Sequence, residues 1–307
     1  PRVGLQNAGD DCFWQCVVPA FVRTRPLLAW LQRHRDCGEE ACLVCALREV
    51  TESMRQVGRA TWVLVAQLRR LVRVEGVLGA HMRAGQHDVG VCLQALMQRL
   101  AADDDAARVG AGAERVALPE LVGTVVRRRL RCVLCARVKD EIDGEQLVHL
   151  VHIDAGCEAE DEEVRLVDLL RRQGETRMAE AKQCQFADAD GSACHRAGGF
   201  YVVAQRPEWG PPVLWLQLCR GQQDGRGRQR KEGRHVEIGR ELPWAGGTYD
   251  LIAVIEHQGA RTTSGHYVCA VRARGRQGAM EWTLCDDKKA QPRTEAQVAE
   301  MQAYVLV

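Results

Sequence analysis

The chain has 307 residues, and its 42 basic side chains almost balance its 41 acidic ones, giving a formal net charge of +1. Because the chain has no strong positive field, its composition argues against a nucleic-acid-binding protein. The apolar share of 46% and the charged share of 27% are typical of a globular protein, and no apolar run is long enough to cross a membrane. We therefore expect neither nucleic acid nor membrane among its partners.

Fourteen cysteines are many for a chain of this length. In a secreted protein they would indicate disulfides, whereas in an intracellular protein they indicate metal binding or catalysis. The pairs Cys42/Cys45 and Cys132/Cys135 have the Cys-x-x-Cys spacing that delivers two thiolates to one metal ion. We favour metal binding and a reducing compartment, and predict a cytoplasmic or nuclear location. The start at Pro1, without an initiator Met or a signal segment, is typical of a domain excised from a longer protein.

The first part of the chain has the pattern of helices. Residues 12–34 carry apolar side chains at helical spacing, with Asp11 at the expected N-cap and with interruptions at Pro19 and Pro26. Residues 56–75 and 88–101 also read as amphipathic helices, whereas the acidic, then Gly-containing run 101–113 reads as a loop. The pattern therefore predicts a helical N-terminal part.

From about residue 125 the pattern changes to that of strands. Segments 128–138 and 146–154 are rich in β-formers, and a short helix is predicted around 164–172. Further strands are predicted at 199–205, 212–220, 234–238, 248–257, 265–274 and 280–286. This order predicts an α+β protein with a helical N-terminal part, a β-rich C-terminal part and a cleft between the two halves.

Three polar groups have the pattern of a cysteine protease. Cys12 lies where a helix is predicted to begin, and the helix dipole would favour its thiolate. His266 begins a predicted strand, and Asp286 and Asp287 end the next one. On adjacent antiparallel strands such groups lie within reach of each other, so an imidazole and an orienting carboxylate can form a pair. Each signal alone is weak, because lone cysteines and histidines are usually structural.

The joint context of these residues resembles the ubiquitin-specific protease family. The stretch from Gly4 to Phe13 resembles its cysteine box, and Tyr249 to Tyr267 resembles its histidine box. Three other stretches resemble, in chain order, its glutamine–aspartate motif, the strand after its fingers and its C-terminal end: Gly85 to Asp88, Pro212 to Arg220, and Trp282 to Leu306. The resemblance covers essentially the whole chain.

This resemblance implies a papain-like cysteine protease fold with thumb, fingers and palm, at residues 1–124, 125–205 and 206–307, within one catalytic domain. It implies Cys12 as nucleophile, His266 as general base, Asp286 as orienting carboxylate and Asn7 as oxyanion donor. Asp287 is a second candidate for a polar supporting role. The implied activity is hydrolysis of the bond after the C-terminal glycine of ubiquitin through a thioester, with ubiquitin and ubiquitinated proteins as partners and no cofactor for catalysis. The oligomeric state is not predicted.

The cysteine box departs from the family pattern immediately before the nucleophile. Asp10 and Asp11 stand where the family usually has Asn and then Ser or Thr. A neighbouring carboxylate disfavours a thiolate, although Asp11 can instead cap the helix. Pro19 is also expected to kink or end the helix that bears Cys12. An alternative to an active enzyme is therefore a catalytically weak or inactive ubiquitin-binding scaffold. An unrelated papain-like protease without a ubiquitin requirement is a third reading, which the histidine box disfavours.

Two clusters are candidates for structural zinc. The first joins His34, Cys37, Cys42 and Cys45, and a subset of the family has a similar cluster after its first helix. The alternative for this cluster is three buried thiols and a surface histidine. The second joins Cys132 and Cys135 with Cys184 and Cys194, in the place of the zinc that the family holds at the tips of its fingers, with His195 as a competing last ligand.

Overall fold

The N-terminal part of the computed structural model is helical. The structure describes residues 5, 7, 9–34, 37–56, 62–73, 86–108, 116–132, 135–153, 164–175, 178–181, 200–223, 229–262, 264–275 and 278–307. Its first elements are α1 (Cys12–Gln15), α2 (Val17–Arg23), α3 (Arg25–Arg33), α4 (Leu43–Arg55), α5 (Trp62–Arg73), α6 (Val89–Arg108) and α7 (Leu118–Val122). No described helix is both long and apolar enough to cross a membrane. The helix α4 was not anticipated from the sequence, which drew attention there only to its cysteines.

Two features of the helical part refine the sequence-based expectations. The expected break near Pro19 is found at Cys16, between α1 and α2. Proline lacks the N–H that would bond to the carbonyl of Gln15, and its ring crowds that carbonyl. The prediction of a loop over 101–113 is wrong for residues 101–108, because α6 continues to Arg108, and residues 109–113 lie outside the described residues. Partners from outside the helix, described below, hold Asp103 and Asp104 and so offset the poor helix propensity of aspartate.

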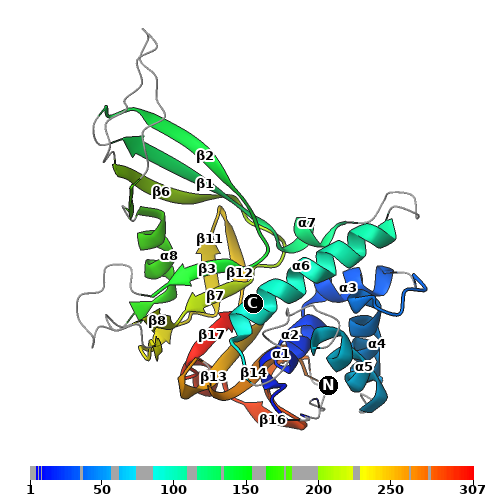
Figure 1. Cartoon of the computed structure of the whole chain (residues 1–307). Helices are drawn as coiled ribbons and strands as arrows, with labels where there is room; N and C mark the ends of the chain where they lie inside the picture. Colours follow the sequence, from blue (N-terminus) through cyan, green and yellow to red (C-terminus); the bar gives the residue numbers. More distant parts are fainter. Residues whose placement is uncertain are drawn as a thin grey trace.

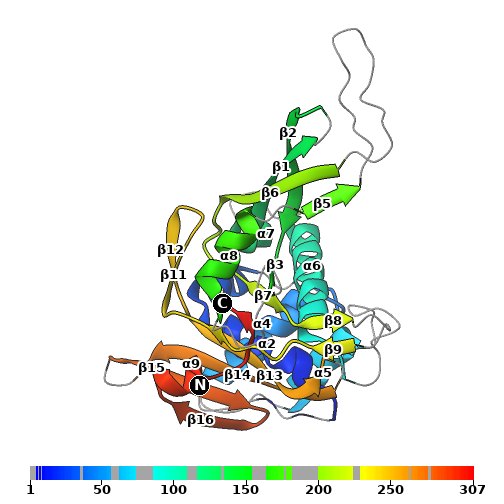
Figure 2. The ribbon, with the colours of Figure 1, turned by 90° about the vertical axis from the view of Figure 1, so that its left-hand side faces the viewer.

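A four-stranded sheet with the order β2-β1-β6-β5 projects from the rest of the molecule, as Figures 1 and 2 show. Its strands are β1 (Thr124–Cys132), β2 (Val138–Gln146), β5 (Met178–Ala181) and β6 (Phe200–Trp209). At the end of β1, Arg131 pairs with Val138 of β2 and Cys132 pairs with Tyr201 of β6, and both pairings are antiparallel. Cys132 therefore lies at the end of a hairpin rather than inside one continuous strand over 128–138.

The largest sheet has seven strands in the order β16-β15-β14-β13-β17-β7-β3. Its strands are β3 (His149–His152), β7 (Leu216–Cys219), β13 (Ala253–Arg261), β14 (Ser264–Arg274), β15 (Met280–Asp286), β16 (Lys289–Arg293) and β17 (Ala303–Leu306). Side chains of β13 and β14 alternate between its two faces, as strand geometry requires. Ile255 and Cys269 pack with the helices, whereas Val254 and Ala270 pack into a second core on the other face.

The second core is closed by shorter elements. Leu169 of α8 (Leu166–Glu175) and Val298 of α9 (Glu295–Ala299) are buried in it. The remaining strands form three two-stranded pairs: β4 (Val164–Arg165) with β10 (Val236–Glu237), β8 (Gly221–Gln223) with β9 (Gln229–Lys231), and β11 (Glu241–Trp244) with β12 (Gly247–Asp250). The sheet is thus covered on both faces, with α1 and α2 against β14 on the face nearer the N-terminus.

Candidate active site and metal centre

Cys12 is the first residue of α1 and is only 2% exposed. Its thiol lies against the backbone of Tyr267, the residue that follows His266 on β14, and a hydrogen bond from this backbone favours the thiolate. Burial is nevertheless the larger effect and raises the pKa of Cys12, and the negative charge of Asp287 raises it further. The fold therefore brings Cys12 to the histidine strand, in surroundings that raise the pKa of its thiol.

His266 and Asp286 form the pair that the sequence predicted. His266 lies near the start of β14 and Asp286 ends the antiparallel strand β15. The His266 Nε2 atom is 2.7 Å from Asp286 Oδ1, and both side chains are about one-third exposed. A carboxylate on Nε2 holds the proton there and leaves Nδ1 unprotonated, as a general base requires.

Asp287 lies within the same group of polar atoms. Its carboxylate and the nearest polar atoms of His266 and Asp286 all lie within 4.8 Å of one another. Its backbone has φ +47°, in the left-handed region that aspartate tolerates better than most residues. Asp287 therefore lies beside His266 and Asp286 on a turn whose backbone conformation is costly for most side chains.

Asn7 is positioned by the loop that precedes the nucleophile. Its Oδ1 accepts hydrogen bonds from the backbone N–H groups of Gly9, at 3.0 Å, and Asp11, at 3.2 Å. Since both contacts use the amide oxygen, its two N–H donors point the other way. The loop thus fixes the orientation of a side-chain donor five residues before Cys12.

Asp11 does not act as the side-chain N-cap that the sequence suggested, because its carboxylate makes no capping hydrogen bond. The carboxylate is fully buried and accepts from Arg73 Nε at 2.5 Å, Arg69 Nε at 2.7 Å and Trp14 Nε1 at 3.1 Å. Arg73 also donates to the carbonyl of Asp10 and lies 5.1 Å from the centre of the Phe13 ring. Two arginines therefore balance the charge that stands next to the thiol.

Arg69 and Arg73 were not expected at this site from the sequence. They lie 58 and 62 residues from Asp11 in the chain, and no motif of the family includes them. The one available signal was their spacing of four residues within a predicted helix, which places both on one face. The clamp formed by Asp11, Arg69 and Arg73 is a feature of the packed structure.

Gln86 supports the loop that carries His266. Its Oε1 accepts from the backbone N–H of Gly265 at 2.8 Å. Gly265 has φ +154°, and a Cβ there would lie 2.6 Å from Nε2 of His257 and 2.5 Å from the carbonyl oxygen of Gln258. Only glycine fits this position, and Gln86, three residues before α6, holds it through this hydrogen bond.

Asp88 and Lys231 hold the surroundings of the histidine strand. Asp88 accepts from the hydroxyl of Tyr304 and from the backbone N–H of Gly90, at 2.7 Å for the latter. Lys231 Nζ donates to the carbonyl oxygens of His257, at 2.6 Å, and Gly259, at 3.0 Å. Lys231 therefore gives a partner to two carbonyl groups of the segment before His266, which restrains that segment.

His34, Cys37, Cys42 and Cys45 come together at the end of α3 and the start of α4. Their ligand atoms all lie within 4.8 Å of one another. The sulfurs of Cys37 and Cys45 are 3.7 Å apart, and Cys42 Sγ is 3.4 Å from His34 Nε2. Tetrahedral zinc, with bonds of about 2.3 Å to sulfur and 2.0 Å to nitrogen, separates its ligands by roughly 3.5–3.8 Å. The donor set and its spacing fit zinc.

The C-terminal half of α6 supports this cluster. Asp104 Oδ1 lies 3.6 Å from Nδ1 of His34, the ring nitrogen that does not face the cysteines, and Asp104 Oδ2 accepts from the Trp30 indole at 3.1 Å. Asp103 accepts from the backbone N–H of Leu43, directly after Cys42, at 2.7 Å. A carboxylate next to a histidine ligand favours a proton on the ring nitrogen that faces it, although 3.6 Å is an ion-pair distance and too long for a hydrogen bond. These contacts also account for the extension of α6 beyond its expected end.

The second predicted zinc cluster is only partly within the described residues. Cys132 is buried at the end of β1 and Cys135 is half-buried in the turn toward β2. The turn includes a hydrogen bond from the N–H of Ala136 to the carbonyl of Cys132, at 2.9 Å. Cys184, Cys194 and His195 lie outside the described residues, so this cluster stays a prediction.

Comparison with known proteins identifies one family. The family model described as "Ubiquitin carboxyl-terminal hydrolase" matches residues 3–307. "Ubiquitin carboxyl-terminal hydrolase 19" of Arabidopsis thaliana is 24% identical over 99% of this chain and 45% of its own length. "Ubiquitin carboxyl-terminal hydrolase 42" of Homo sapiens is 24% identical over 99% of this chain and 22% of its own length. The chain therefore spans less than half the length of these relatives.

Solved structures share the fold. The SAGA Ubp8/Sgf11/Sus1/Sgf73 DUB module bound to ubiquitin aldehyde includes a chain that matches with a TM-score of 0.75 and 17% identity, over 99% of this chain and 68% of the other. A second structure of the Ubp8-Sgf11-Sgf73-Sus1 module matches with a TM-score of 0.73 and 19% identity, over 99% and 66%. The predicted α+β, papain-like fold is confirmed by these likenesses.

Proposed function

Because the chain belongs to the ubiquitin carboxyl-terminal hydrolase family, we propose that it is a thiol-dependent deubiquitinase with Cys12 as its nucleophile. The observation that carries the catalytic assignment is the 2.7 Å contact between His266 Nε2 and Asp286 Oδ1. Tyr267, the residue after His266 on β14, contacts the thiol of Cys12 through its backbone, so this pair lies next to the proposed nucleophile. The resemblance of the sequence to the ubiquitin-specific proteases agrees with this family. Ubiquitin and ubiquitinated proteins are the proposed partners, and the ubiquitin aldehyde bound to the related DUB module supports them.

In the proposed reaction, Nδ1 of His266 takes the proton of Cys12, and the thiolate attacks the carbonyl carbon of the C-terminal glycine of ubiquitin. Negative charge then develops on the carbonyl oxygen, where the Asn7 amide and the backbone N–H of Cys12 act as donors. The imidazolium returns its proton to the leaving amine as the C–N bond breaks, and a thioester remains. His266 next removes a proton from water, whose attack releases ubiquitin with a free carboxylate and restores the Cys12 thiol.

Asp286 and the arginine clamp have separate tasks in this proposal. Asp286 keeps the proton of His266 on Nε2 and stabilises the imidazolium while it exists. Arg69 and Arg73 balance Asp11, so that this carboxylate adds little negative potential at the thiol. The departure of the cysteine box from the family pattern is thereby compatible with catalysis.

We also propose that His34, Cys37, Cys42 and Cys45 hold a structural zinc ion. When bound, zinc would tie the end of α3 to the start of α4 through four protein ligands, with no open position for water or substrate. Its four ligands lie at the end of α3 and the start of α4, whereas Cys12 belongs to α1 and His266 to β14. The ion would therefore support the helical part of the fold and take no part in bond cleavage.

The test is hydrolysis of ubiquitin–7-amido-4-methylcoumarin by the purified chain. Cys12→Ala should lower the rate by roughly 10⁴-fold or more, because the residues of a catalytic set act as a unit. Cys16→Ala is the matched control, since Cys16 is a second buried thiol one turn away, and it should retain most of the activity. Equal slow rates for wild type and Cys12→Ala would show that Cys12 does not carry the reaction.

The second candidate function is a ubiquitin-binding scaffold with little turnover. It is favoured by one observation, the burial that raises the pKa of Cys12. Ubiquitin propargylamide distinguishes the two functions, because it reacts covalently with an aligned nucleophile. A covalent adduct on Cys12 within minutes supports the enzyme, whereas ubiquitin binding without an adduct supports the scaffold.

A further inference from the structure

A large cavity lies behind the active site, at the opposite ends of the elements that carry it. Its volume is about 960 Å³, and Arg23 at the end of α2, Arg274 at the end of β14 and Met280 at the start of β15 line it. Cys12, His266 and Asp286 lie at the other ends of the α1–α2 segment, β14 and β15. The cavity is therefore separate from the catalytic centre but is built on the same elements.

The charged side chains that line the cavity are almost all of one sign. Among the described residues that line it there are six arginines and one aspartate, an excess of five positive charges within a chain whose total is +1: Arg23, Arg25, Arg55, Arg240, Arg272 and Arg274, with Asp250. This described lining includes neither lysine nor glutamate. Arginine presents a planar fork of N–H donors that matches phosphate and carboxylate oxygens in pairs.

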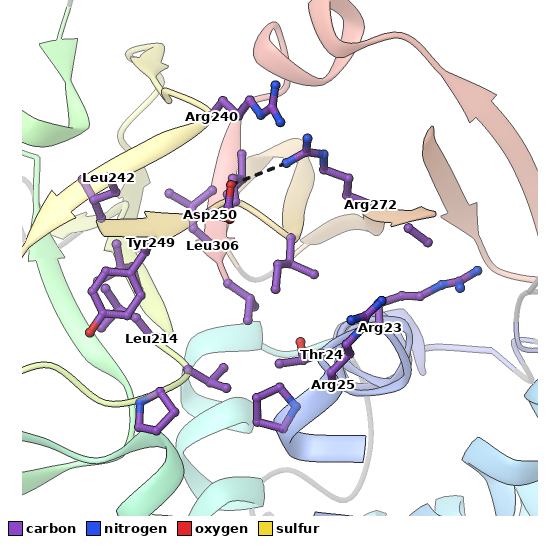
Figure 3. Close-up of a pocket in the computed structure, with 18 of the residues that line it drawn as sticks. Arg23, Thr24, Arg25, Leu214, Arg240, Leu242, Tyr249, Asp250, Arg272 and Leu306 are labelled. Atoms are coloured by element: carbon purple, nitrogen blue, oxygen red, sulfur yellow. Dashed lines mark ion pairs between the residues drawn. The ribbon is translucent and has the colours of Figure 1, made fainter. Parts of the chain in front are cut away.

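Two of these arginines are held in the cavity without full compensation. The side chain of Arg272 is 7% exposed, and its ion pair with Asp250 spans 4.0 Å, beyond hydrogen-bond range (Figure 3). Arg23 Nε is buried and has no hydrogen-bond partner among the described residues, and burial lowers the pKa of Arg23. An ordinary solvated surface does not bury guanidinium donors in this way, because their desolvation is costly.

Most of the remaining described lining residues are apolar and lie beside the arginines. Figure 3 shows Leu214, Leu242 and Tyr249 on one side of the cavity, and Arg23, Arg25, Arg240 and Arg272 on the others. The Tyr249 hydroxyl donates to the carbonyl of Pro211 at 2.9 Å, which fixes the ring in the wall. A cationic part next to a rigid apolar part matches a ligand that is anionic at one end and organic at the other.

We propose that this cavity binds an organic polyphosphate, with its phosphates at the arginines and its organic part against the wall of Leu214, Leu242 and Tyr249. A terminal phosphate carries up to two negative charges and each inner phosphate carries one, so a triphosphate brings about four negative charges to the net excess of five positive charges in this volume. An acidic peptide supplies at most one carboxylate per residue and would have to place five acidic residues and their backbone there. The charge density therefore favours phosphate.

The bound ligand would join the two halves of the molecule. Arg23, Arg25 and Arg55 belong to the helices, whereas Arg240, Arg272 and Arg274 belong to the β-rich part. Phosphates that contact both groups would restrain the end of α2 against the ends of β14 and β15.

Isothermal titration calorimetry of the wild-type chain at about 0.15 M ionic strength, where exposed charges are largely screened, tests the proposal. The probes are ATP and tripolyphosphate, which share their phosphates and differ in the organic part, with hexaglutamate as the peptide arm. We expect saturable binding of one ATP per chain, tighter than that of tripolyphosphate, and much weaker binding of hexaglutamate. Absence of saturable binding of both phosphates, hexaglutamate as tight as tripolyphosphate, or ATP no tighter than tripolyphosphate would overturn the proposal.

Variants locate the site. The double variant Arg25→Gln/Arg240→Gln changes two exposed arginines and should weaken ATP binding by about tenfold or more, since charge-assisted hydrogen bonds are lost. Arg131→Gln/Arg230→Gln removes the same charge from exposed positions outside the cavity and should leave binding within about twofold. Arg272→Gln, checked for folding by its thermal unfolding, should weaken binding at least as much as the double variant. Equal affinities in all variants would place the bound phosphate elsewhere and contradict the proposal.

Discussion

The carboxylate of Asp11 is bound by Arg73, with Arg73 Nε 2.5 Å from Asp11 Oδ1 and both side chains buried. This ion pair joins the end of α5 to the residue directly before the proposed nucleophile. An unpaired carboxylate beside Cys12 would oppose thiolate formation, and the ion pair with Arg73 reduces this effect of Asp11. The balance of charge depends on a residue 62 positions away in the chain.

Arg73→Gln should therefore destabilise the protein and slow the enzyme. The change leaves the buried Asp11 carboxylate with Arg69 as its one remaining arginine, and loss of a buried partner costs about 3 kcal/mol of unfolding free energy. The reaction of Cys12 with iodoacetamide should also shift to higher pH, since the negative charge next to the thiol is less balanced. Urea unfolding and the pH profile of alkylation, with Cys12→Ala to identify the labelled site, measure the two effects.

The matched control for this prediction is Asp11→Asn/Arg73→Gln, which removes both charges. It should recover part of the stability and bring the alkylation profile back toward that of the wild type. Arg69→Gln, in which the lost side chain is 42% exposed, should have a smaller effect than Arg73→Gln. An alkylation profile that is the same in Arg73→Gln and in wild type would contradict the electrostatic role of Arg73.

Gln86→Ala should lower kcat with little change in KM. The backbone N–H of Gly265 would lose its acceptor, and the turn that sets the direction of His266 would be less restrained. We expect a loss of about tenfold in kcat for ubiquitin–7-amido-4-methylcoumarin, near the net value of one buried hydrogen bond. Gln94→Ala removes a comparable amide, bonded to Gln217 on β7, and should leave kcat nearly unchanged. A rise in KM alone would show that Gln86 acts on substrate binding instead.

The sequence predicted those parts of the site that depend on local pattern. Local pattern made Cys12, His266 and Asp286 candidates, and the family resemblance implied their roles; the pairing of β14 with β15 brings the last two together. The contacts of Arg73 and Gln86 could not be predicted, because the direction of a side chain between distant segments is decided by packing. The same holds for α6, whose last turns form where Asp103 and Asp104 meet groups from α3 and α4.

Stability should fall as the pH is lowered from about 6.5 toward 4. Burial lowers the pKa of His149 and of His257 to about 4, and the unfolded chain titrates near 6.5. Between these values the unfolded state binds more protons, so the free energy of unfolding rises with pH by up to about 1.4 kcal/mol per pH unit for each histidine. Urea unfolding at pH 5 and pH 7 measures the slope.

His149→Phe should reduce the slope of the unfolding free energy against pH by the contribution of one histidine. The substitution keeps an aromatic ring next to Trp244, whose ring centre is 5.1 Å away, and removes the buried titrating group. His235→Phe, at an exposed position, should leave the slope unchanged. Equal slopes in His149→Phe and wild type would show that His149 is not the neutral buried group that its surroundings indicate.

Asp104→Asn should weaken zinc binding at the cluster of His34, Cys37, Cys42 and Cys45 by about 10- to 100-fold. The carboxylate 3.6 Å from His34 Nδ1 orients the ring and raises its basicity, and a neutral amide does neither as well. Competition with a chromophoric chelator measures the affinity, and the absorption of the Co²⁺-substituted chain reports the ligand set. Asp105→Asn is the matched control, because Asp105 is the next residue of α6 and is exposed. Less than about one zinc per chain in well-folded wild-type protein would contradict the zinc assignment itself, whereas equal affinities in both variants would contradict only the role of Asp104.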